Sequence, residues 1–350
     1  MVYAFYTAIV LLLLCFVRIK PNNADTVIFT KNDTLCLKGI SAVFVLLHHL
    51  GQYFEIPDPI QFNGYMGGMA VGIFFLLSAY GLTKANRKKG YYKRIFRQKI
   101  PALYVYQVLM NTLYYCLFFT KECGSVGEVL IRIFNFDFLF GYERLNGFSW
   151  FITSILVVYA CYGGLAYVWE KVGEKCKNQR FWFAVICTAI IAVLYVLALA
   201  TPIKTLYGRS IFCFALGVWV ALFEKEILQF MRVRKRYFMT CIGATALLLL
   251  CFFLLPEQFV CIATCVFVTV FFIGFSYPRS PIFEFLGKIS LEIYLVQAIF
   301  FTIMPFEREW RDGVPVFALV LESAFVLYML VKGIKLLIAR LKSKANKKKA

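Results

Sequence analysis

The sequence predicts an all-α protein, a polytopic bundle of transmembrane helices. Of its 350 residues, 61% are hydrophobic and the mean hydropathy is +0.73, whereas soluble domains contain about 45–50% apolar residues. A hydrocarbon core of about 30 Å is crossed by about 20 residues of helix, and eleven apolar runs of roughly that length recur along the chain. We therefore expect about eleven membrane-spanning helices in one domain, with the bilayer as their solvent.

The first apolar run could be mistaken for a signal peptide. It lacks a basic start, and the sequence RIKPNN after it supplies no small-residue cleavage site, so we interpret it as a helix. The eleven runs are 2–17, 35–54, 66–83, 101–119, 149–168, 181–200, 206–223, 238–255, 259–275, 284–304 and 315–336.

The net charge of +19 follows the expected topology and does not indicate a nucleic-acid partner. With eleven spans, one side of the membrane receives 29 Lys and Arg residues and the other side seven. The positive-inside rule then predicts an external N-terminus and a cytoplasmic C-terminus. We expect the basic tail LKSKANKKKA to contact anionic lipid headgroups as well. The basic side comprises 18–34, 84–100, 169–180, 224–237, 276–283 and the tail from Lys332.

Neither the cysteines nor the histidines predict a metal centre. Most of the 12 cysteines lie inside apolar runs, where Cys behaves as a small hydrophobe, and only Cys123 falls in an external loop. The chain has two histidines and no Cys pair at ligand spacing beside them. No nucleotide-binding loop and no strong internal repeat is found.

Two segments between spans allow two interpretations each. The external stretch 120–148 has an apolar middle, VLIRIFNFDFLFG, which suits either an interfacial helix or a lid over an outward-facing site. The basic stretch KANRKKGYYKRIFRQKIP is either a topology anchor or a phosphate-binding entrance. The second interpretation rests on Arg94 and Arg97, which lie three residues apart before Pro101.

Ionisable side chains within spans are costly and are therefore functional candidates. From Lys38 to His49 is eleven helical steps, about 20° beyond three full turns and about 16 Å along the axis. These two residues share a face, whereas His48 lies about 80° away from Lys38. A neutral imidazole at position 49 could act as a general base if a partner orients its ring. The alternative is that both histidines merely hydrogen-bond to backbone or water near the external end.

Glu292 is the other acid of interest, in the sequence GKISLEIYLVQ. Tyr294 and Gln297 lie near it at helical spacing. Glu292 could pair with a cation, orient an imidazole, or serve as a buried structural acid.

Six stretches occur in the order of one family's motifs. They are Lys38 with His49 after ten intervening residues, MGGMAVGIFFLLSAYGL, KRIFRQKIP, NGFSWFITSILVVYACYGGL, YGRSIFCFALGVWVA and FEFLGKISLEIYLVQ. Together they resemble the acyltransferase 3 family of bacterial integral membrane acyltransferases, many of which O-acetylate surface polysaccharides. The resemblance covers nearly everything after the first span. It implies a ten-helix core (35–340), preceded by an extra helix and linker (1–34) and followed by a basic tail (341–350).

The sequence departs from the family pattern at three positions. Gly72 stands where many members have Asp, Leu291 where Tyr is common, and Gln297 where His is common. We expect a membrane-only member of the family, without a hydrolase-like domain after the membrane part.

The resemblance implies a transferase of the bacterial inner membrane that moves an acyl group, most simply acetyl from acetyl-CoA, to a carbohydrate hydroxyl. His49 would be the catalytic base or acyl carrier, with Glu292 assisting it. Lys38, Arg94 and Arg97 would bind the donor from the cytoplasm. The acceptor would be a cell-surface or lipid-linked glycan, and no metal is implied. The remaining positions, implied to bind substrate, are Ser78, Trp150, Tyr294 and Gln297.

Two other functions remain open at this level. A transporter of polysaccharide or lipid-linked sugar also needs many spans. Inverted repeats and paired broken helices would favour that interpretation, and we do not see them in the sequence. A non-catalytic membrane partner is the other alternative, since Asp is absent at position 72 and His at position 297.

Overall fold

The protein is seen in a computed structural model, which describes residues 17–20, 27–53, 62–119, 125–142, 145–173, 176–200, 208–277, 280–303 and 313–347. The first expected span, 2–17, lies outside the described residues except for its last residue. The elements are β1 (Arg18–Ile19), α2 (Lys31–Tyr53), α3 (Phe62–Ala85), α4 (Tyr91–Arg94), the π-helical turn η1 (Ile95–Lys99), α5 (Ile100–Tyr114), the π-helical turn η2 (Tyr115–Phe119), α6 (Val126–Ile133), α7 (Asp137–Phe140), the 3-10 turn η3 (Gly147–Ser149), α8 (Trp150–Val172), α9 (Gln179–Ala200), α10 (Phe212–Leu222), α11 (Glu224–Met231), α12 (Arg234–Leu254), α13 (Glu257–Gly274), β2 (Phe275–Ser276), α14 (Pro281–Lys288), α15 (Ser290–Ile303) and α16 (Gly313–Lys347).

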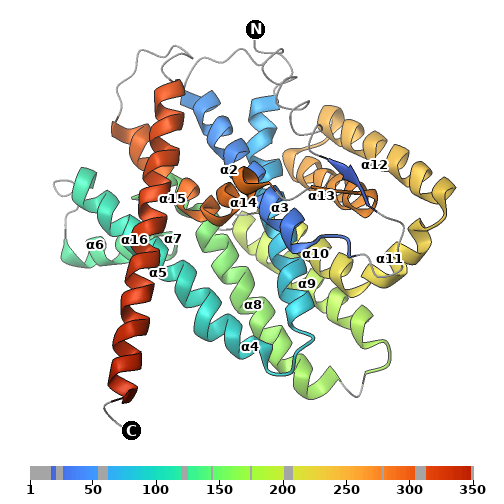
Figure 1. The fold of residues 1–350 in the computed structure, drawn as a ribbon, viewed down its shortest axis with the longest axis horizontal. Coiled ribbons are helices and arrows are strands. Elements are labelled where there is room, and N and C mark those ends of the chain that lie inside the picture. The colour runs from blue at the N-terminus through green and yellow to red at the C-terminus, as the bar shows by residue number, and fades with distance from the viewer. Residues whose placement is uncertain are drawn as a thin grey trace.

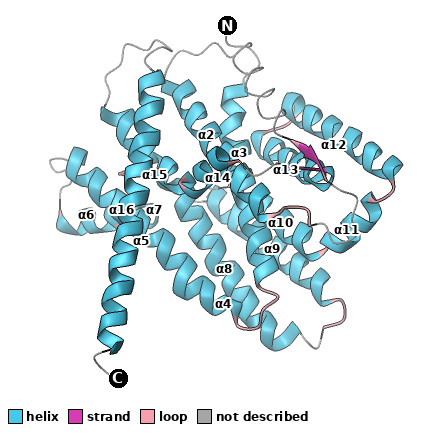
Figure 2. Ribbon diagram, viewed as in Figure 1, coloured by secondary structure: helices cyan, strands magenta, loops and turns pink. Residues whose placement is uncertain are grey.

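The predicted all-α class is confirmed, because helices make up nearly all of the described chain (Figures 1 and 2). The described strands are the two-residue β1 and β2, which pair antiparallel with Arg18 opposite Ser276 and Ile19 opposite Phe275. This short ladder fastens the chain that precedes α2 to the end of α13.

Seven described helices are long and apolar enough to cross a membrane, or eight if α14 and α15 form one bent span. The expected run 206–223 yields only the 11-residue helix α10, and the run 101–119 is divided between α5 and η2. An apolar run of spanning length can form a shorter helix when a turn interrupts it. These two runs therefore contain shorter helical segments than the single long helix that hydropathy predicts for each.

Helix α3 lies at the centre of the bundle. It packs against α2, α10 and α13, and 78% of its most apolar stretch is buried within the protein. Helix α10 approaches it closely because residue 217 is glycine: a Cβ there would lie 2.4 Å from the carbonyl oxygen of Leu76. Close approach through small residues is the usual way to pack membrane helices, since lipid tails provide no hydrophobic drive between them.

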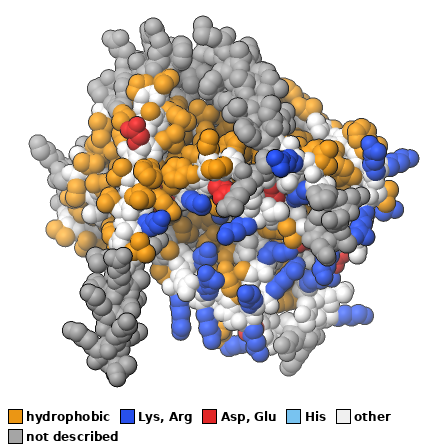
Figure 3. Space-filling view, in the orientation of Figure 1, with side chains coloured by type: hydrophobic (Ala, Val, Ile, Leu, Met, Phe, Trp, Pro, Cys, Tyr) orange, Lys and Arg blue, Asp and Glu red, His pale blue; other side chains and the backbone are white. Residues whose placement is uncertain are grey.

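Three apolar helices lie instead at the periphery. The most apolar stretches of α9, α12 and α16 are only 22%, 11% and 17% buried inside the protein. Exposed apolar helices of this length suit contact with lipid. Hydrophobic side chains cover the left and upper part of the face in Figure 3, and Lys and Arg side chains gather around α4, α8 and α11.

A sharp bend places α15 beside α2. Helices α14 and α15 meet at 66°, and α14 crosses α2 at a pair of glycines. A Cβ at Gly287 would lie 2.0 Å from the carbonyl oxygen of Leu35, and one at Gly39 would lie 2.8 Å from the nitrogen of Gly287. Because this crossing fixes α14, the break at Ile289 sets the direction in which α15 leaves. Helix α15 then runs along the second half of α2.

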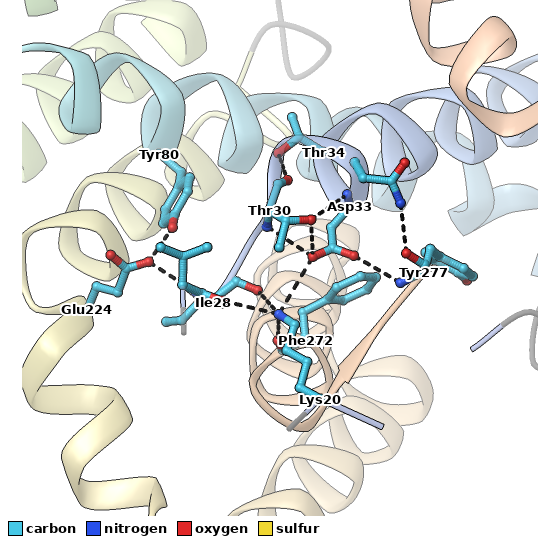
Figure 4. A network of polar contacts seen from close by, with 11 residues as sticks. Lys20, Ile28, Thr30, Asp33, Thr34, Tyr80, Glu224, Phe272 and Tyr277 are labelled. Carbon is cyan, nitrogen blue, oxygen red and sulfur yellow. Dashed lines mark hydrogen bonds and ion pairs between the residues drawn. The ribbon is translucent and has the colours of Figure 1, made fainter. Parts of the chain in front are cut away.

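A buried polar network, shown in Figure 4, ties the segment before α2 to three other parts of the chain. The carboxylate of Asp33 accepts hydrogen bonds from the Thr30 hydroxyl at 2.8 Å, from the Thr30 nitrogen at 2.9 Å and from the Tyr277 nitrogen at 2.9 Å. The Lys20 ammonium lies 3.6 Å from Asp33 and donates to the carbonyl oxygens of Ile28 and Phe272 at 2.6 Å each. Burial lowers the pKa of Lys20, and Asp33 opposes that shift.

Glu224 forms the other half of the same network. Its carboxylate accepts from the Ile28 nitrogen at 3.0 Å, from the Tyr80 hydroxyl and from the Lys84 ammonium. Each described charge in this network therefore has an opposite charge beside it. We refer to the set Lys20, Asp33, Tyr80, Lys84 and Glu224 as the polar clasp.

Residues 125–142 of the segment that allowed two interpretations are hydrogen-bonded to α5. The amide of Asn111 donates to the carbonyl oxygens of Arg132 at 3.3 Å and Ile133 at 3.1 Å, and Gln107 donates to Asn135 at 3.3 Å. On the outer side of α6, Val126 and Leu130 are largely exposed. Buried amides beneath and apolar side chains outside favour the interfacial helix over the lid.

Candidate functional site

A cavity of about 160 Å³ lies where α2, α3, α8, α13 and α15 meet. Both histidines line it, together with residues from six separate stretches of the chain. Its other lining residues are Val45, Gln52, Gly67, Gly68, Val71, Gly147, Phe148, Trp150, Arg209, Glu257 and Tyr294. We call it the histidine cavity.

His49 is buried and held by Gln297, 248 positions further along the chain. Its Nδ1 lies 3.1 Å from Oε1 of Gln297, and Nε2 of the same amide donates to the carbonyl oxygen of Tyr294 at 3.0 Å. The second bond sets the orientation of the amide, so its oxygen is the atom that meets the imidazole. An amide oxygen only accepts, so Nδ1 carries the ring proton and Nε2 has the lone pair.

Aromatic rings enclose the imidazole of His49. The ring of Phe148 packs edge-on against it at 4.2 Å between centroids, and that of Phe301 lies at 6.2 Å. Tyr294 donates its hydroxyl to the carbonyl oxygen of Phe148, so α15 also positions the turn that carries this ring. His49 is therefore buried against aromatic rings, with the amide oxygen of Gln297 as the polar partner of Nδ1.

His48 occupies a different part of the same cavity. It is half-buried, and its Nε2 lies 3.1 Å from the amide nitrogen of Gln52. A Cβ at Gly67 would lie 2.3 Å from its ring, so glycine at this position leaves room for the imidazole. Helical phase distinguishes the two histidines by their alignment with Lys38, yet packing brings both to the cavity.

The cavity also contains an ion pair that sequence reasoning missed. Arg209, in the turn before α10, lies 3.0 Å from the carboxylate of Glu257, the first residue of α13. The signal was weak: each residue stands at the end of an apolar run, where a charge is ordinary. Only the fold brings these two positions, 48 residues apart, to the lining of the histidine cavity.

Lys38 lies three turns before His49 on the same unbroken helix, α2, and is half-buried. The described charge that acts on it is the ammonium of Lys99, of the same sign. Two like charges that act on each other are stabilised when an anion binds near both. Lys99 was not among the predicted site residues, although it lies in the basic stretch. Arg94 and Arg97 are exposed nearby in the chain, and Arg94 donates to Gln98 at 3.0 Å.

The other predicted site residues are divided between the cavity and its surroundings. Trp150 and Tyr294 line the cavity, and Gln297 contacts it through His49. Glu292 is buried and accepts from the Tyr106 hydroxyl at 3.0 Å, which joins α15 to α5 outside the cavity lining. Ser78 lies on α3, seven positions beyond the cavity residue Val71 and so about 10 Å further along the helix. Its side chain is hydrogen-bonded to Tyr159.

Gly72, where relatives often carry Asp, faces sulfur in this chain. A Cβ at position 72 would lie 3.0 Å from Sγ of Cys213 and 3.4 Å from Sγ of Cys265. A side chain at position 72 would therefore require the thiol of Cys213 to shift by a few tenths of an ångström. The described residues contain no group of three or more His, Cys, Asp or Glu side chains that could hold a metal ion.

Comparison with known proteins gives one match. A family model described as an acyltransferase domain matches residues 36–331, which includes the whole histidine cavity. No curated protein and no solved structure matches the chain.

Proposed function

The chain belongs to the acyltransferase 3 family and is a membrane acyltransferase; from this premise we propose that it transfers an acetyl group from cytoplasmic acetyl-CoA to a hydroxyl of a cell-surface or lipid-linked carbohydrate. The observation that carries the proposal is the orientation of His49. Gln297 holds Nδ1–H, which leaves the lone pair on Nε2 in a ring that lines a cavity.

The reaction that suits this arrangement is base-assisted attack. Nε2 of His49 takes the proton of the acceptor hydroxyl, and the oxygen attacks the carbonyl carbon of the thioester. The C–O bond forms, the C–S bond breaks, and the departing thiolate takes the proton back from the imidazole. The amide of Gln297 supports the imidazole in both protonation states, because its oxygen accepts from Nδ1–H throughout.

The donor would enter from the end of α2 that carries Lys38. Lys38 and Lys99, whose charges act on each other, would provide cations for the phosphates of CoA, and about 16 Å of helix separates Lys38 from His49. Arg94 and Arg97, which are exposed on α4 and η1, provide further cations at the entrance. The proposal includes the bacterial inner membrane, an external N-terminus, a cytoplasmic C-terminus and contact of the basic tail with lipid headgroups, supported by the distribution of Lys and Arg.

The test uses membranes from cells with and without the gene. Radiolabelled acetyl-CoA is added, the glycan fraction is purified, and acetate released by mild alkali is counted as ester-linked label. We expect label only where the wild-type chain is present, and none with His49→Ala at matched protein level. Equal label in membranes that lack the gene would contradict the proposal.

A second experiment addresses the donor side. Arg94→Ala combined with Arg97→Ala should raise the apparent KM for acetyl-CoA more than that for the acceptor. An unchanged KM for acetyl-CoA would remove the two arginines from the donor site.

A further inference from the structure

A second cavity shares a wall with the histidine cavity. It measures about 180 Å³ and is lined by Tyr195, Arg209, Glu257 and Gln258. Arg209 and Glu257 line both cavities. The ion pair therefore stands between two adjoining spaces, one with the histidines and the other with Tyr195 and Gln258.

The wall is shaped to receive this pair. A Cβ at Gly68 would lie 2.2 Å from Oε1 of Glu257, so the carboxylate fits against α3 only because residue 68 has no side chain. Ser210 donates its hydroxyl to the carbonyl oxygen of Gly68 at 2.9 Å, which holds the turn that carries Arg209 against the same place on α3. Two contacts thus position the Glu257 carboxylate: α3 at Gly68 on one side and the guanidinium of Arg209 on the other.

The pair retains unused hydrogen-bonding capacity. A guanidinium has five N–H donors and a carboxylate has about four acceptor sites, and the Arg209 Nη1–Glu257 Oε2 contact occupies one of each. The Arg209 side chain is 37% exposed and that of Glu257 17%, whereas the carboxylates of the polar clasp are at most 5% exposed. The pair can therefore donate to one hydroxyl and accept from another.

The charge and shape of the two spaces indicate the class of ligand. The positive charge of Arg209 is compensated by Glu257, so the wall has no net charge with which to select an anion. Phe148, Trp150 and Tyr195 supply aromatic surface. A cavity of about 150 Å³ holds a six-membered ring such as benzene, so each space suits about one ring.

We propose that the two cavities bind two adjacent sugar rings of an uncharged acceptor, with the Arg209–Glu257 pair hydrogen-bonded to the hydroxyls between them. The ring to be acetylated lies beside His49, and its neighbour lies beside Tyr195 and Gln258. This inference rests on the proposed function and adds the acceptor class: a neutral glycan of at least two units.

The test uses the full-length chain in membranes, with radiolabelled acetyl-CoA and the glycan fraction of the same cells as acceptor. The variants are Arg209→Gln, Glu257→Gln and the charge-reversed double variant Arg209→Glu with Glu257→Arg. The matched control is Arg180→Gln, which removes an ion pair to Glu226 at 2.7 Å on the exposed surface. Apparent KM is measured separately for glycan and for acetyl-CoA.

We expect both single variants to raise the KM for glycan at least tenfold, with the KM for acetyl-CoA changed less than twofold. The charge-reversed variant should not restore transfer, because donors and acceptors would then face the wrong hydroxyls. Arg180→Gln should behave as wild type. After digestion of the labelled glycan, anion exchange should recover the label in unretained, neutral fragments of two or more sugars.

Several results would overturn the inference. An unchanged KM for glycan, or an equal rise in the KM for acetyl-CoA, would remove the pair from acceptor binding. Restored transfer in the charge-reversed variant would make it a structural ion pair. Label in retained, acidic fragments would make the acceptor anionic. Absence of transfer by the wild-type chain would instead contradict the proposed function itself.

Discussion

The polar clasp and the histidine cavity are both polar regions inside an apolar bundle, but they differ in how their polar groups are enclosed. In the clasp, Lys20 meets Asp33 and Lys84 meets Glu224, and backbone N–H groups donate further hydrogen bonds to the same carboxylates. In the histidine cavity, the Arg209–Glu257 pair and the imidazole of His49 border an open space, so their polar groups are not enclosed as those of the clasp are.

The difference indicates two uses of buried polarity. A charge that is paired and hydrogen-bonded fixes the arrangement of the chain, and removing one partner is costly because the other stays buried. A polar group beside an open space keeps capacity for a ligand. The following predictions, from the largest expected effect to the smallest, test that division.

Removal of the imidazole at position 49 should have the largest effect. His49→Ala should lower the rate of acetyl transfer by at least about 10²-fold, the lower end of the range for loss of a general base. His48→Ala, in the same cavity, should retain most of the transfer, because Gln297 orients the imidazole of His49 and not that of His48. Transfer is measured as ester-linked label at matched protein level. Full activity of His49→Ala would indicate that both histidines are structural.

Disruption of the polar clasp should lower the stability of the fold without changing the rate of acetyl transfer. Asp33→Asn leaves Lys20 buried without its carboxylate, which should reduce the free energy of unfolding by about 3–5 kcal/mol. Thermal or denaturant unfolding of the purified chain measures this, and transfer per folded molecule should stay near the wild-type value. Glu226→Gln, in an exposed pair, is the control and should change the free energy by less than about 1 kcal/mol. A large drop in transfer per folded molecule would erase the distinction between the two regions.

The partner of His49 should have an intermediate effect. Gln297→Leu removes the oxygen that holds Nδ1–H, and we expect about a tenfold fall in kcat, equivalent to about 1.4 kcal/mol of activation free energy. Gln297→Glu keeps an acceptor oxygen at the same position and should retain most of the rate. If Leu and Glu behave alike, the orientation of the imidazole does not depend on residue 297.

The smallest effect is expected at the donor cations. Lys38→Gln or Lys99→Gln should each raise the KM for acetyl-CoA by roughly fivefold, equivalent to about 1 kcal/mol, and the effect should shrink with added salt as charges are screened. Lys31→Gln, exposed at the start of α2, is the control. A rise in the KM for glycan with no change for acetyl-CoA would place this end of the helix on the acceptor side.

Sequence reasoning succeeded where a property is local to one helix. The eleven-step spacing from Lys38 to His49 requires only that α2 be continuous, and α2 does run unbroken through both residues. It was less successful where helices end. The run 206–223 was expected to span, whereas α10 has 11 residues, because hydropathy does not record the turn at 208–211 that carries Arg209.

The contacts that shape the site were decided by tertiary structure. Gln297 meets His49 across 248 residues, and Arg209, in the turn before α10, meets Glu257 at the start of α13. These contacts depend on how closely helices approach, which glycines such as Gly39, Gly68 and Gly287 permit. By itself, the sequence determined the all-α membrane class, the stripe from Lys38 to His49 and the family motifs, because hydropathy and helical phase are properties of neighbouring residues. The tautomer of His49, the ion pair and the second cavity follow from helix crossings, and a crossing is set by the packing of distant segments.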